Sequence, residues 1–313
     1  MLICRGIPGK ARASVALSIG NFDGIHVGHR AMLTRLAQSA KSRGLVSCVL
    51  TFEPHPREFF APLSAPARLS NLREKLEAFA SLGVERTHIC RFNRNFSSMT
   101  AQEFIERVVC GGLNAKWLLV GEDFRFGSKR AGDLALLQKA GQKLDFEVTV
   151  MPSIMLKGQR ISSTMVRDAL AEGDLERASE LLGKPYSMSG RVVHGDKTGR
   201  RIGFPTANIK IKHARPPLGG IFAVEVSGIS ECPLKGVASL GVRPTIMDNG
   251  APVLEVHVFD FNREIYGQHV RVEFVHKLRE EEKYPDLKTL TQQISLDVEK
   301  AKEYFFAAAA QRQ

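Results

Sequence analysis

The N-terminal half of the chain is organised around one stretch, Asn21-Phe22-Asp23-Gly24-Ile25-His26-Val27-Gly28-His29. An apolar run at 14–19 precedes it and predicts a buried strand, and apolar residues at helical spacing follow it as far as Gly44. A helix N-terminus attracts phosphate, and glycines let a ligand approach the backbone closely. The sequence therefore predicts a nucleotide at this turn, with His26 and His29 facing one anion. The competing interpretation is that both are incidental turn residues, which is the commoner case for a lone histidine. The residues expected to bind the nucleotide's phosphates are Gly20, Asn21, Phe22, Asp23, Gly24 and Gly28.

Composition limits the class of protein. The chain has 313 residues, which favours two domains, and 44 Lys and Arg against 33 Asp and Glu give a net charge of +11 that suits an anionic partner. Its 5 cysteines show no C-x-x-C spacing, which argues against a disulfide framework and a zinc site. No apolar run approaches the roughly 20 residues of a membrane span. We expect a soluble, cytoplasmic protein without a membrane partner.

Strands and helices alternate through the N-terminal half. Their order predicts a parallel, doubly wound α/β sheet of the Rossmann-like kind, with ligands at the carboxyl ends of the strands. The segment Glu53-Pro54-His55-Pro56 is expected to turn, because its prolines stop either regular element. A capping box at Thr100 and Glu103 predicts the start of a helix. Further strands are expected at 45–52, 84–90, 117–120 and 146–150, and helices at 71–82 and 133–139.

Two more segments of this half carry candidate binding residues. The run 121–127 mixes acid, base and aromatic residues between glycines, which suits a base and phosphate pocket that includes Asp123 and Phe124, although an ordinary polar connection has the same composition. The run 160–167 places Ser163 and Thr164 between two arginines. Either residue is also a plausible helix cap. With Arg160 they are the candidates for contacts to a triphosphate.

From Lys184 onward the pattern changes to short β-rich runs. Six such runs without intervening helices predict a six-stranded antiparallel β-barrel, and only the tail of the chain is helical again. The domain boundary is expected near Gly183-Lys184-Pro185, which gives domains at 1–184 and 185–313. The expected strands lie at 188–194, 207–211, 221–226, 236–240, 253–260 and 270–276.

A glycine-rich basic loop opens the barrel. Gly195, Lys197 and Gly199 are expected to bind phosphate there, although the loop lacks the Walker P-loop pattern. Thr206 and Asn208 follow in an extended segment and present two neutral oxygens on one face, a donor set that suits Mg²⁺. The competing interpretation is a plain turn, since Pro, Thr and Asn are ordinary turn residues.

Glu255 interrupts the apolar strand 253–260. An isolated acid in a strand usually faces solvent. A carboxylate able to accept a hydroxyl proton is nevertheless what phosphorylation of an alcohol requires, together with magnesium and basic groups at the transferred phosphoryl. The sequence therefore makes Glu255 a candidate general base.

Both halves resemble known families. The motif His26-Val27-Gly28-His29 in its Asn-Phe-Asp-Gly context resembles the HxGH signature of nucleotidyltransferases, in particular FAD synthetases, and 14–182 is similar throughout to that half of prokaryotic bifunctional riboflavin kinase/FAD synthetases. The remainder resembles their riboflavin kinase domain, most specifically in Pro205-Thr206-Ala207-Asn208. One departure is Phe222, which stands where the family usually has tyrosine.

The resemblance implies two ATP-dependent, magnesium-requiring reactions. Riboflavin would become FMN in the barrel, with Glu255 as general base and with Thr206 and Asn208 binding Mg-ATP, and FMN would become FAD in the N-terminal domain, where His26 and His29 would stabilise the ATP phosphates. ATP, riboflavin and FMN are the expected small-molecule partners. Alternatives are a single-activity nucleotidyltransferase with a non-catalytic flavin-binding barrel, or a non-enzymatic nucleic-acid binder or flavin sensor. Nucleic acid is disfavoured because no recognition module is present. The sequence leaves the oligomeric state and a role for 53–56 open.

Overall fold

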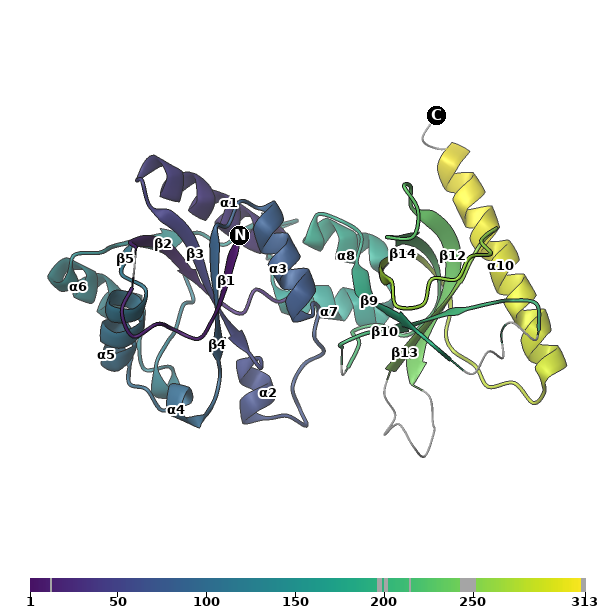
Figure 1. The fold of residues 1–313 in the computed structure, drawn as a ribbon, viewed down its shortest axis with the longest axis horizontal. Helices are drawn as coiled ribbons and strands as arrows, with labels where there is room; N and C mark the ends of the chain where they lie inside the picture. The colour runs from purple at the N-terminus through teal and green to yellow at the C-terminus, as the bar shows by residue number, and fades with distance from the viewer. Residues whose placement is uncertain (12, 196–198, 200–201, 214, 243–251, 311–313) are drawn as a thin grey trace. The chain divides into compact units, whose positions relative to one another are not determined.

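The structure is a computed structural model that describes residues 1–11, 13–195, 199, 202–213, 215–242 and 252–310. It divides into two compact units (Figure 1). The first comprises Met1–Pro66 and Leu72–Ser162, and the second comprises Ala67–Asn71 and Ser163–Gln313. Residues 163–184 therefore group with the barrel in this division. A functional boundary at 184 stays a prediction.

The first unit is built on a six-stranded sheet in the order β1-β4-β3-β2-β5-β6. Every neighbouring pair is parallel, which confirms the doubly wound prediction. Parallel strands with crossover helices place their carboxyl ends at one edge, where ligands of such folds bind. The strands are β1 (Leu2–Arg5), β2 (Val15–Ile19), β3 (Val46–Glu53), β4 (Arg86–Arg91), β5 (Ala115–Gly121) and β6 (Glu147–Met151).

Apolar helix faces cover both sides of this sheet. Helices α1 (Val27–Ser42) and α3 (Leu72–Ser81) bury Leu33, Leu36 and Phe79 against one side. The other side packs against α5 (Ala101–Glu103), the π-helical turn η1 (Phe104–Gly112) and α6 (Leu134–Leu144). The capping box of Thr100 and Glu103 is present as predicted. Shorter elements are α4 (Arg94–Ser97), η2 (Ser128–Arg130) and the hairpin β7 (Met155–Leu156) with β8 (Gln159–Arg160).

The segment 53–56 turns as expected, but the turn leads directly into a helix that the sequence analysis missed. Strand β3 ends at Glu53, and α2 (Pro56–Phe60) begins at the second proline. Proline is tolerated in the first turn of a helix because its missing N–H has no partner there in any case. His55 caps this helix and forms a capping box with Glu58.

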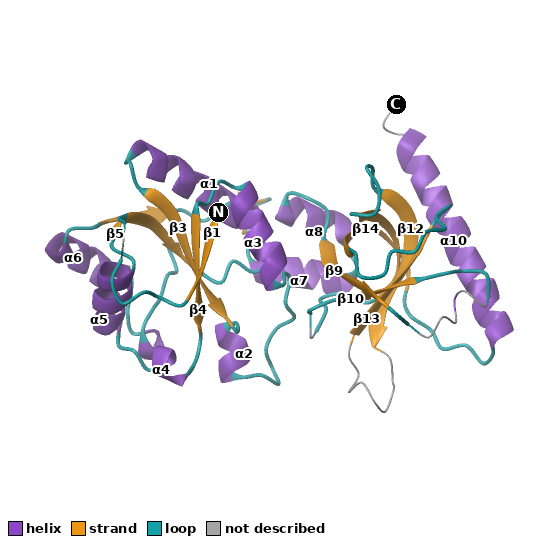
Figure 2. Cartoon of the chain, viewed as in Figure 1, coloured by secondary structure: helices purple, strands orange, loops and turns teal. Residues whose placement is uncertain are grey.

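The second unit is a barrel of strands, shown in orange in Figure 2. It is closed, antiparallel and six-stranded, as predicted, with the order β10-β13-β12-β11-β14-β9. Before it come α7 (Ser163–Glu172) and α8 (Leu175–Leu182), and after it comes α10 (Leu287–Ala310). No helix among the described residues is long and apolar enough to span a membrane. The strands are β9 (Ser187–Val193), β10 (Ala207–Lys210), β11 (Gly220–Ser227), β12 (Leu234–Val242), β13 (Pro252–Val258) and β14 (His269–Arg279).

Side chains alternate between the inside and outside of this barrel. On β13 the buried residues Leu254, Val256 and Val258 alternate with the half-buried Glu255 and His257. Helix α10 packs on the outer face, where its Val298, Ala301 and Phe305 form one cluster with residues of β11 and β12. Glu255 thus projects outward from the barrel, on the surface that α10 partly covers.

Candidate functional sites

The turn between β2 and α1 has an unusual backbone. Phe22, Gly24 and Ile25 all have positive φ angles, of 49°, 82° and 45°. Non-glycine residues adopt this conformation only where the surrounding structure holds them in it, and such strain clusters at functional sites. The ring of Phe22 is buried, with its centroid 5.2 Å from that of His29 and 5.4 Å from that of Phe79. The side chain of Phe22 therefore anchors the turn in the core, and only its backbone is available to a ligand.

His26 and His29 lie together at the start of α1, as predicted. Their rings stack with centroids 3.7 Å apart, and His26 caps the helix by accepting a hydrogen bond at Nδ1 from the backbone N–H of His29 (3.3 Å). Gly28 permits this arrangement, because a Cβ there would lie 3.2 Å from the His26 ring. An accepting Nδ1 leaves Nε2 of His26 as the protonated nitrogen of the neutral ring.

The surroundings keep both rings uncharged at neutral pH. Burial, followed by the charge of Arg160, lowers the pKa of His26 to about 4, although Asp23 acts in the opposite direction. Burial, together with His26 and Lys75, also lowers the pKa of His29 well below its usual value. The pair is therefore suited to donating hydrogen bonds rather than to contributing formal charge.

Two buried polar atoms at this turn have no hydrogen-bond partner within the described part of the chain. They are Oδ1 of Asn21 and Nδ1 of His29. Buried polar groups are nearly always paired, and an unpaired one requires an explanation such as a missing ligand. Asp23 is also buried, although it takes part in interactions of its own. The turn thus has the character of a binding site.

The loop after β5 and the β7–β8 hairpin meet through an ion pair. Asp123 and Arg160 lie 2.8 Å apart, and Arg160 also acts electrostatically on His26. These two predicted site residues therefore belong to the same region of the first unit. Phe124 stacks on Phe126 at a centroid distance of 5.5 Å and packs partly in the core. The predicted residues Ser163 and Thr164 begin α7, which belongs to the second unit.

A row of phenylalanines in the first unit escaped the sequence analysis. Successive ring centroids lie 5.2–6.2 Å apart, and the row runs from the exposed Phe60 to Phe124 beyond the end of β5. The only signal in the sequence is composition, with 18 Phe against 4 Tyr and 1 Trp. The members are Phe60, Phe59, Phe92, Phe96, Phe104, Phe126 and Phe124, with Phe52 beside Phe92 and Phe96.

In the barrel, Gly195 and Gly199 lie close against the segment that runs from Phe204 to Asn208. A Cβ on Gly195 would collide with the side-chain amide of Asn208, and one on Gly199 would collide with the carbonyl of Phe204 and lie 3.2 Å from Oγ1 of Thr206. This close approach explains why both positions are glycine, since neither has space for a Cβ. Lys197, the third predicted phosphate-binding residue of the loop, lies outside the described residues.

Glu255 is next to this segment across the sheet. On the antiparallel pair β10–β13 it stands directly opposite Asn208, so the two predicted residues are neighbours. Nδ1 of His257 donates a hydrogen bond to the carbonyl of Pro205 (2.9 Å), and its ring packs edge-on against Phe204. His257 thus ties the Thr206 segment to the strand that carries Glu255.

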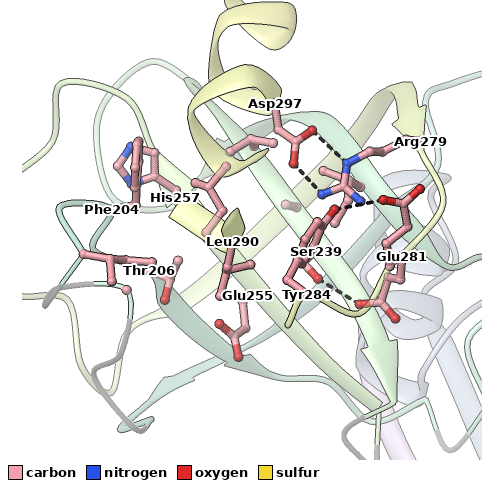
Figure 3. Close-up of a pocket in the computed structure, with 17 residues that line it drawn as sticks. Phe204, Thr206, Ser239, Glu255, His257, Arg279, Glu281, Tyr284, Leu290 and Asp297 are labelled. Carbon is pink, nitrogen blue, oxygen red and sulfur yellow. Dashed lines mark hydrogen bonds and ion pairs between the residues drawn. The ribbon is translucent and has the colours of Figure 1, made fainter. Parts of the chain in front are cut away.

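Thr206 and Glu255 line a pocket of about 240 Å³ on the outside of the barrel (Figure 3). Its walls come from the glycine loop, β11–β13, the end of β14 and α10, and they combine apolar side chains with a polar end around Arg279. Ligand pockets typically have this mixed character. The polar lining residues that sequence reasoning missed are Ser239, Arg279, Glu281, Glu282, Tyr284 and Asp297.

The donors around this pocket fit magnesium better than a transition metal. Within the described residues, no three His, Cys, Asp or Glu side chains form a metal-binding group. Asn208 instead stands opposite Glu255, and Thr206 lines the same pocket as Glu255, so both offer neutral oxygens near that carboxylate. Mg²⁺ usually takes one or two protein oxygens and completes its shell with phosphate and water. The residues present therefore fit a magnesium–nucleotide complex.

Comparison with known proteins shows the family of each half of the chain. The family model for FAD synthetase matches residues 9–165, and that for riboflavin kinase matches residues 182–305. The bifunctional riboflavin kinase/FMN adenylyltransferase of Escherichia coli (strain K12) is 46% identical over 308 residues, which cover 97% of this chain and 98% of the relative. The chain belongs to the bifunctional riboflavin kinase/FMN adenylyltransferase family.

Other members and a solved structure extend the comparison. The family member of Haemophilus influenzae is 47% identical over 308 residues, or 97% of this chain and 99% of its own. A crystal structure described as a macrolide-efflux protein from Streptococcus pneumoniae is 30% identical, with a TM-score of 0.79 over 95% of this chain and 97% of that one. The family's two domain matches thus occur here in one chain, and the solved structure covers nearly all of it. Each matched range contains one of the two sites described above.

Proposed function

We propose that the β2–α1 turn is the site of FMN adenylylation and that the pocket on the barrel is the site of riboflavin phosphorylation. The chain carries both activities of its family, the conversion of riboflavin to FMN and of FMN to FAD with ATP. One observation supports the assignment of sites most strongly. Each matched domain contains a cluster of predicted residues whose chemistry suits its own reaction, His26 with His29 in the first and Thr206 with Glu255 in the second.

In the kinase reaction the carboxylate of Glu255 accepts the proton of the riboflavin 5′-hydroxyl. The hydroxyl oxygen bonds to the γ-phosphorus of ATP, the bond to the bridging oxygen breaks, and ADP leaves. Thr206 and Asn208 would hold magnesium, which neutralises developing phosphate charge when it is bound. The backbone of the loop around Gly195 and Gly199 receives the phosphates. Lys197 belongs to the same proposal through its place in that loop.

In the adenylylation reaction a phosphate oxygen of FMN attacks the α-phosphorus of ATP, and pyrophosphate leaves. This nucleophile is already an anion, so the step needs positioning and charge stabilisation rather than a general base. The Nε2–H of His26, the neighbouring His29 and the guanidinium of Arg160 supply these. Backbone groups of Gly20 to Gly24 and the start of α1 complete the anion site.

The remaining predicted residues have narrower roles in this proposal. Asp123 orients Arg160 through their 2.8 Å ion pair, and Phe124 offers a ring face to the nucleotide or flavin. Ser163 and Thr164 stay candidates for the triphosphate. The five cysteines are unpaired, and we propose a reducing, cytosolic setting on that ground.

The alternative functions have less support. A non-catalytic barrel would not need the Thr206, Asn208 and Glu255 donor set, which is intact and adjacent to a pocket. A nucleic-acid binder or a flavin sensor would show tight binding without ATP turnover. Two buried orphan atoms at the β2–α1 turn and a built pocket on the barrel instead favour two small-molecule sites.

A reciprocal pair of variants tests the assignment. His29→Ala should abolish formation of FAD and leave conversion of riboflavin to FMN at the wild-type rate. Glu255→Gln should abolish FMN formation while externally supplied FMN is still converted to FAD. Chromatographic separation of the flavins over time measures both reactions in one sample.

Glu273→Gln is the matched control, since Glu273 is a half-buried strand glutamate that does not line the pocket. It should change neither rate. Loss of both activities in a folded His29→Ala protein would contradict separate sites. Wild-type kinase activity in Glu255→Gln would exclude Glu255 as the base.

A further inference from the structure

The segment between β14 and α10 lies across one end of the barrel pocket. We call Glu280-Glu281-Glu282-Lys283-Tyr284 the acidic strap. It is anchored by Arg279, whose Nε and Nη2 donate to the buried carboxylate of Asp297 at 2.8 and 2.7 Å. Gln293 on α10 also donates to Asp297, at 3.0 Å. The strap therefore leaves from a fixed point at the pocket wall (Figure 3).

The three glutamates of the strap have different partners. Glu280 pairs with Lys277 at 2.5 Å, and Glu282 accepts a hydrogen bond from the hydroxyl of Tyr284 at 3.1 Å. Glu281 instead reaches the barrel and accepts a hydrogen bond from the hydroxyl of Ser239 on β12 at 3.0 Å. Its carboxylate rests over Gly241, where a Cβ would collide with both carboxylate oxygens. The glycine thus provides the space that Glu281 fills.

The contact of Glu281 lies beside the proposed general base. Ser239 stands directly opposite Glu255 on the antiparallel pair β12–β13, and both residues line the pocket. A serine hydroxyl has a single hydrogen to donate, so Ser239 cannot donate to a substrate while it donates to Glu281. A carboxylate at this position also opposes the approach of phosphate next to Glu255. The contact is solvent-exposed and therefore weak enough to be exchanged.

We propose that Glu281 is an internal competitor of riboflavin, which holds the Ser239 hydroxyl in the free enzyme and has to leave it when the substrate hydroxyl reaches Glu255. Ser239 then donates to the bound substrate and contributes to its recognition. This inference rests on the assignment of the barrel pocket to riboflavin phosphorylation. It adds that the Glu281 side chain occupies part of that pocket until riboflavin displaces it, and that Ser239 helps to bind riboflavin.

Two independent changes should release the competitor. Glu281→Ala removes the carboxylate. Gly241→Ala fills the space that the carboxylate occupies and leaves the sequence of the acidic strap unchanged. If the contact is formed in about 90% of free molecules, the apparent KM for riboflavin is raised about tenfold, so we expect either variant to lower it by about 3- to 10-fold with kcat unchanged. The double variant should resemble the single variants, because both remove the same contact.

Two further variants separate a released contact from a general change of charge. Glu280→Gln removes a strap charge that is paired with Lys277, and it should leave the KM at the wild-type value. Ser239→Ala should raise the KM above that of Glu281→Ala, because it removes the donor to the substrate as well as the competitor. The KM is measured on the full-length protein at saturating ATP and magnesium. A separate riboflavin fluorescence titration without ATP gives a binding readout that involves no turnover.

An unchanged or increased riboflavin KM in Glu281→Ala would overturn the inference. So would equal lowering of the KM by Glu280→Gln, which would reflect bulk charge alone. If Gly241→Ala fails to fold, Glu281→Ala and Glu280→Gln still decide the matter. Failure of the underlying assignment is recognised separately, because Glu255→Gln would then retain kinase activity.

Discussion

His26 makes the stability of the N-terminal unit depend on pH. Its ring is buried at the start of α1, and burial together with Arg160 lowers its pKa from 6.5 to about 4. In the unfolded chain the histidine takes up a proton as the pH falls through 6.5, whereas the folded protein excludes that proton until about pH 4. The unfolded state thus binds more protons in this window, and the free energy of unfolding falls as the pH is lowered.

The size of the effect follows from the two pKa values. Each tenfold difference in proton affinity between the two states corresponds to about 1.36 kcal/mol. His26 therefore contributes about 3 kcal/mol to the free energy of unfolding at high pH, and about 2 kcal/mol of this is lost between pH 7 and pH 5. His29 acts in the same direction, because burial and the neighbouring His26 and Lys75 lower its pKa as well. Asp23 opposes the shift of His26 and Arg160 reinforces it.

The single tryptophan makes this measurable. Trp117 is buried on β5, inside the first unit, so its fluorescence during urea unfolding reports on that unit. Between pH 7 and pH 5, the free energy of unfolding of His26→Gln should fall by about 2 kcal/mol less than that of the wild type. Arg160→Gln should give an intermediate dependence, because it removes one cause of the low pKa of His26.

His194→Gln is the matched control, since His194 is exposed and belongs to the second unit. It should unfold as the wild type does at both pH values. An undiminished loss of stability in His26→Gln would refute the argument that a buried neutral His26 causes it.

Two further predictions concern the barrel. Asp297→Ala leaves the guanidinium of Arg279 without its buried carboxylate partner and should destabilise the barrel by about 3–5 kcal/mol, measured by proteolytic susceptibility of the second unit in urea. Gly199→Ala places a Cβ against the carbonyl of Phe204 and should reduce kinase activity at least tenfold while adenylylation of supplied FMN persists. Gly219→Ala, where a Cβ makes only an ordinary 3.4 Å contact, should retain both activities and serves as the control.

The fold was largely predictable because its elements carry strong periodic signals. The buried strand β2 and the apolar face of α1 follow directly from the spacing of their residues, and the six barrel strands follow from their short alternating runs. Strand β1 was missed because Leu2–Arg5 is a short edge strand with exposed side chains. Helix α2 was missed because a proline before a helix gives the same signal as one that ends a strand.

The sites were predictable only where their residues are close in sequence. His26 and His29 form a local motif whose spacing places both rings at the start of one helix. Thr206 and Asn208 are two residues apart, and a shared face for their oxygens stays a prediction. The polar end of the barrel pocket has no such signal. Arg279 ends a strand, and its partner Asp297 lies on a helix 18 residues later.

In the proposed assignment the two sites differ in how they handle protons, and this difference follows from their nucleophiles. An alcohol has to lose a proton as it attacks phosphorus, and the barrel presents a half-buried carboxylate, Glu255, in the wall of its pocket. A phosphate already carries negative charge, so it needs no general base to become a nucleophile. The β2–α1 turn accordingly buries His26 and His29 in a form that donates hydrogen bonds and accepts no proton at neutral pH. Each reaction thus requires a different local environment, which is a physical reason for two sites in one chain.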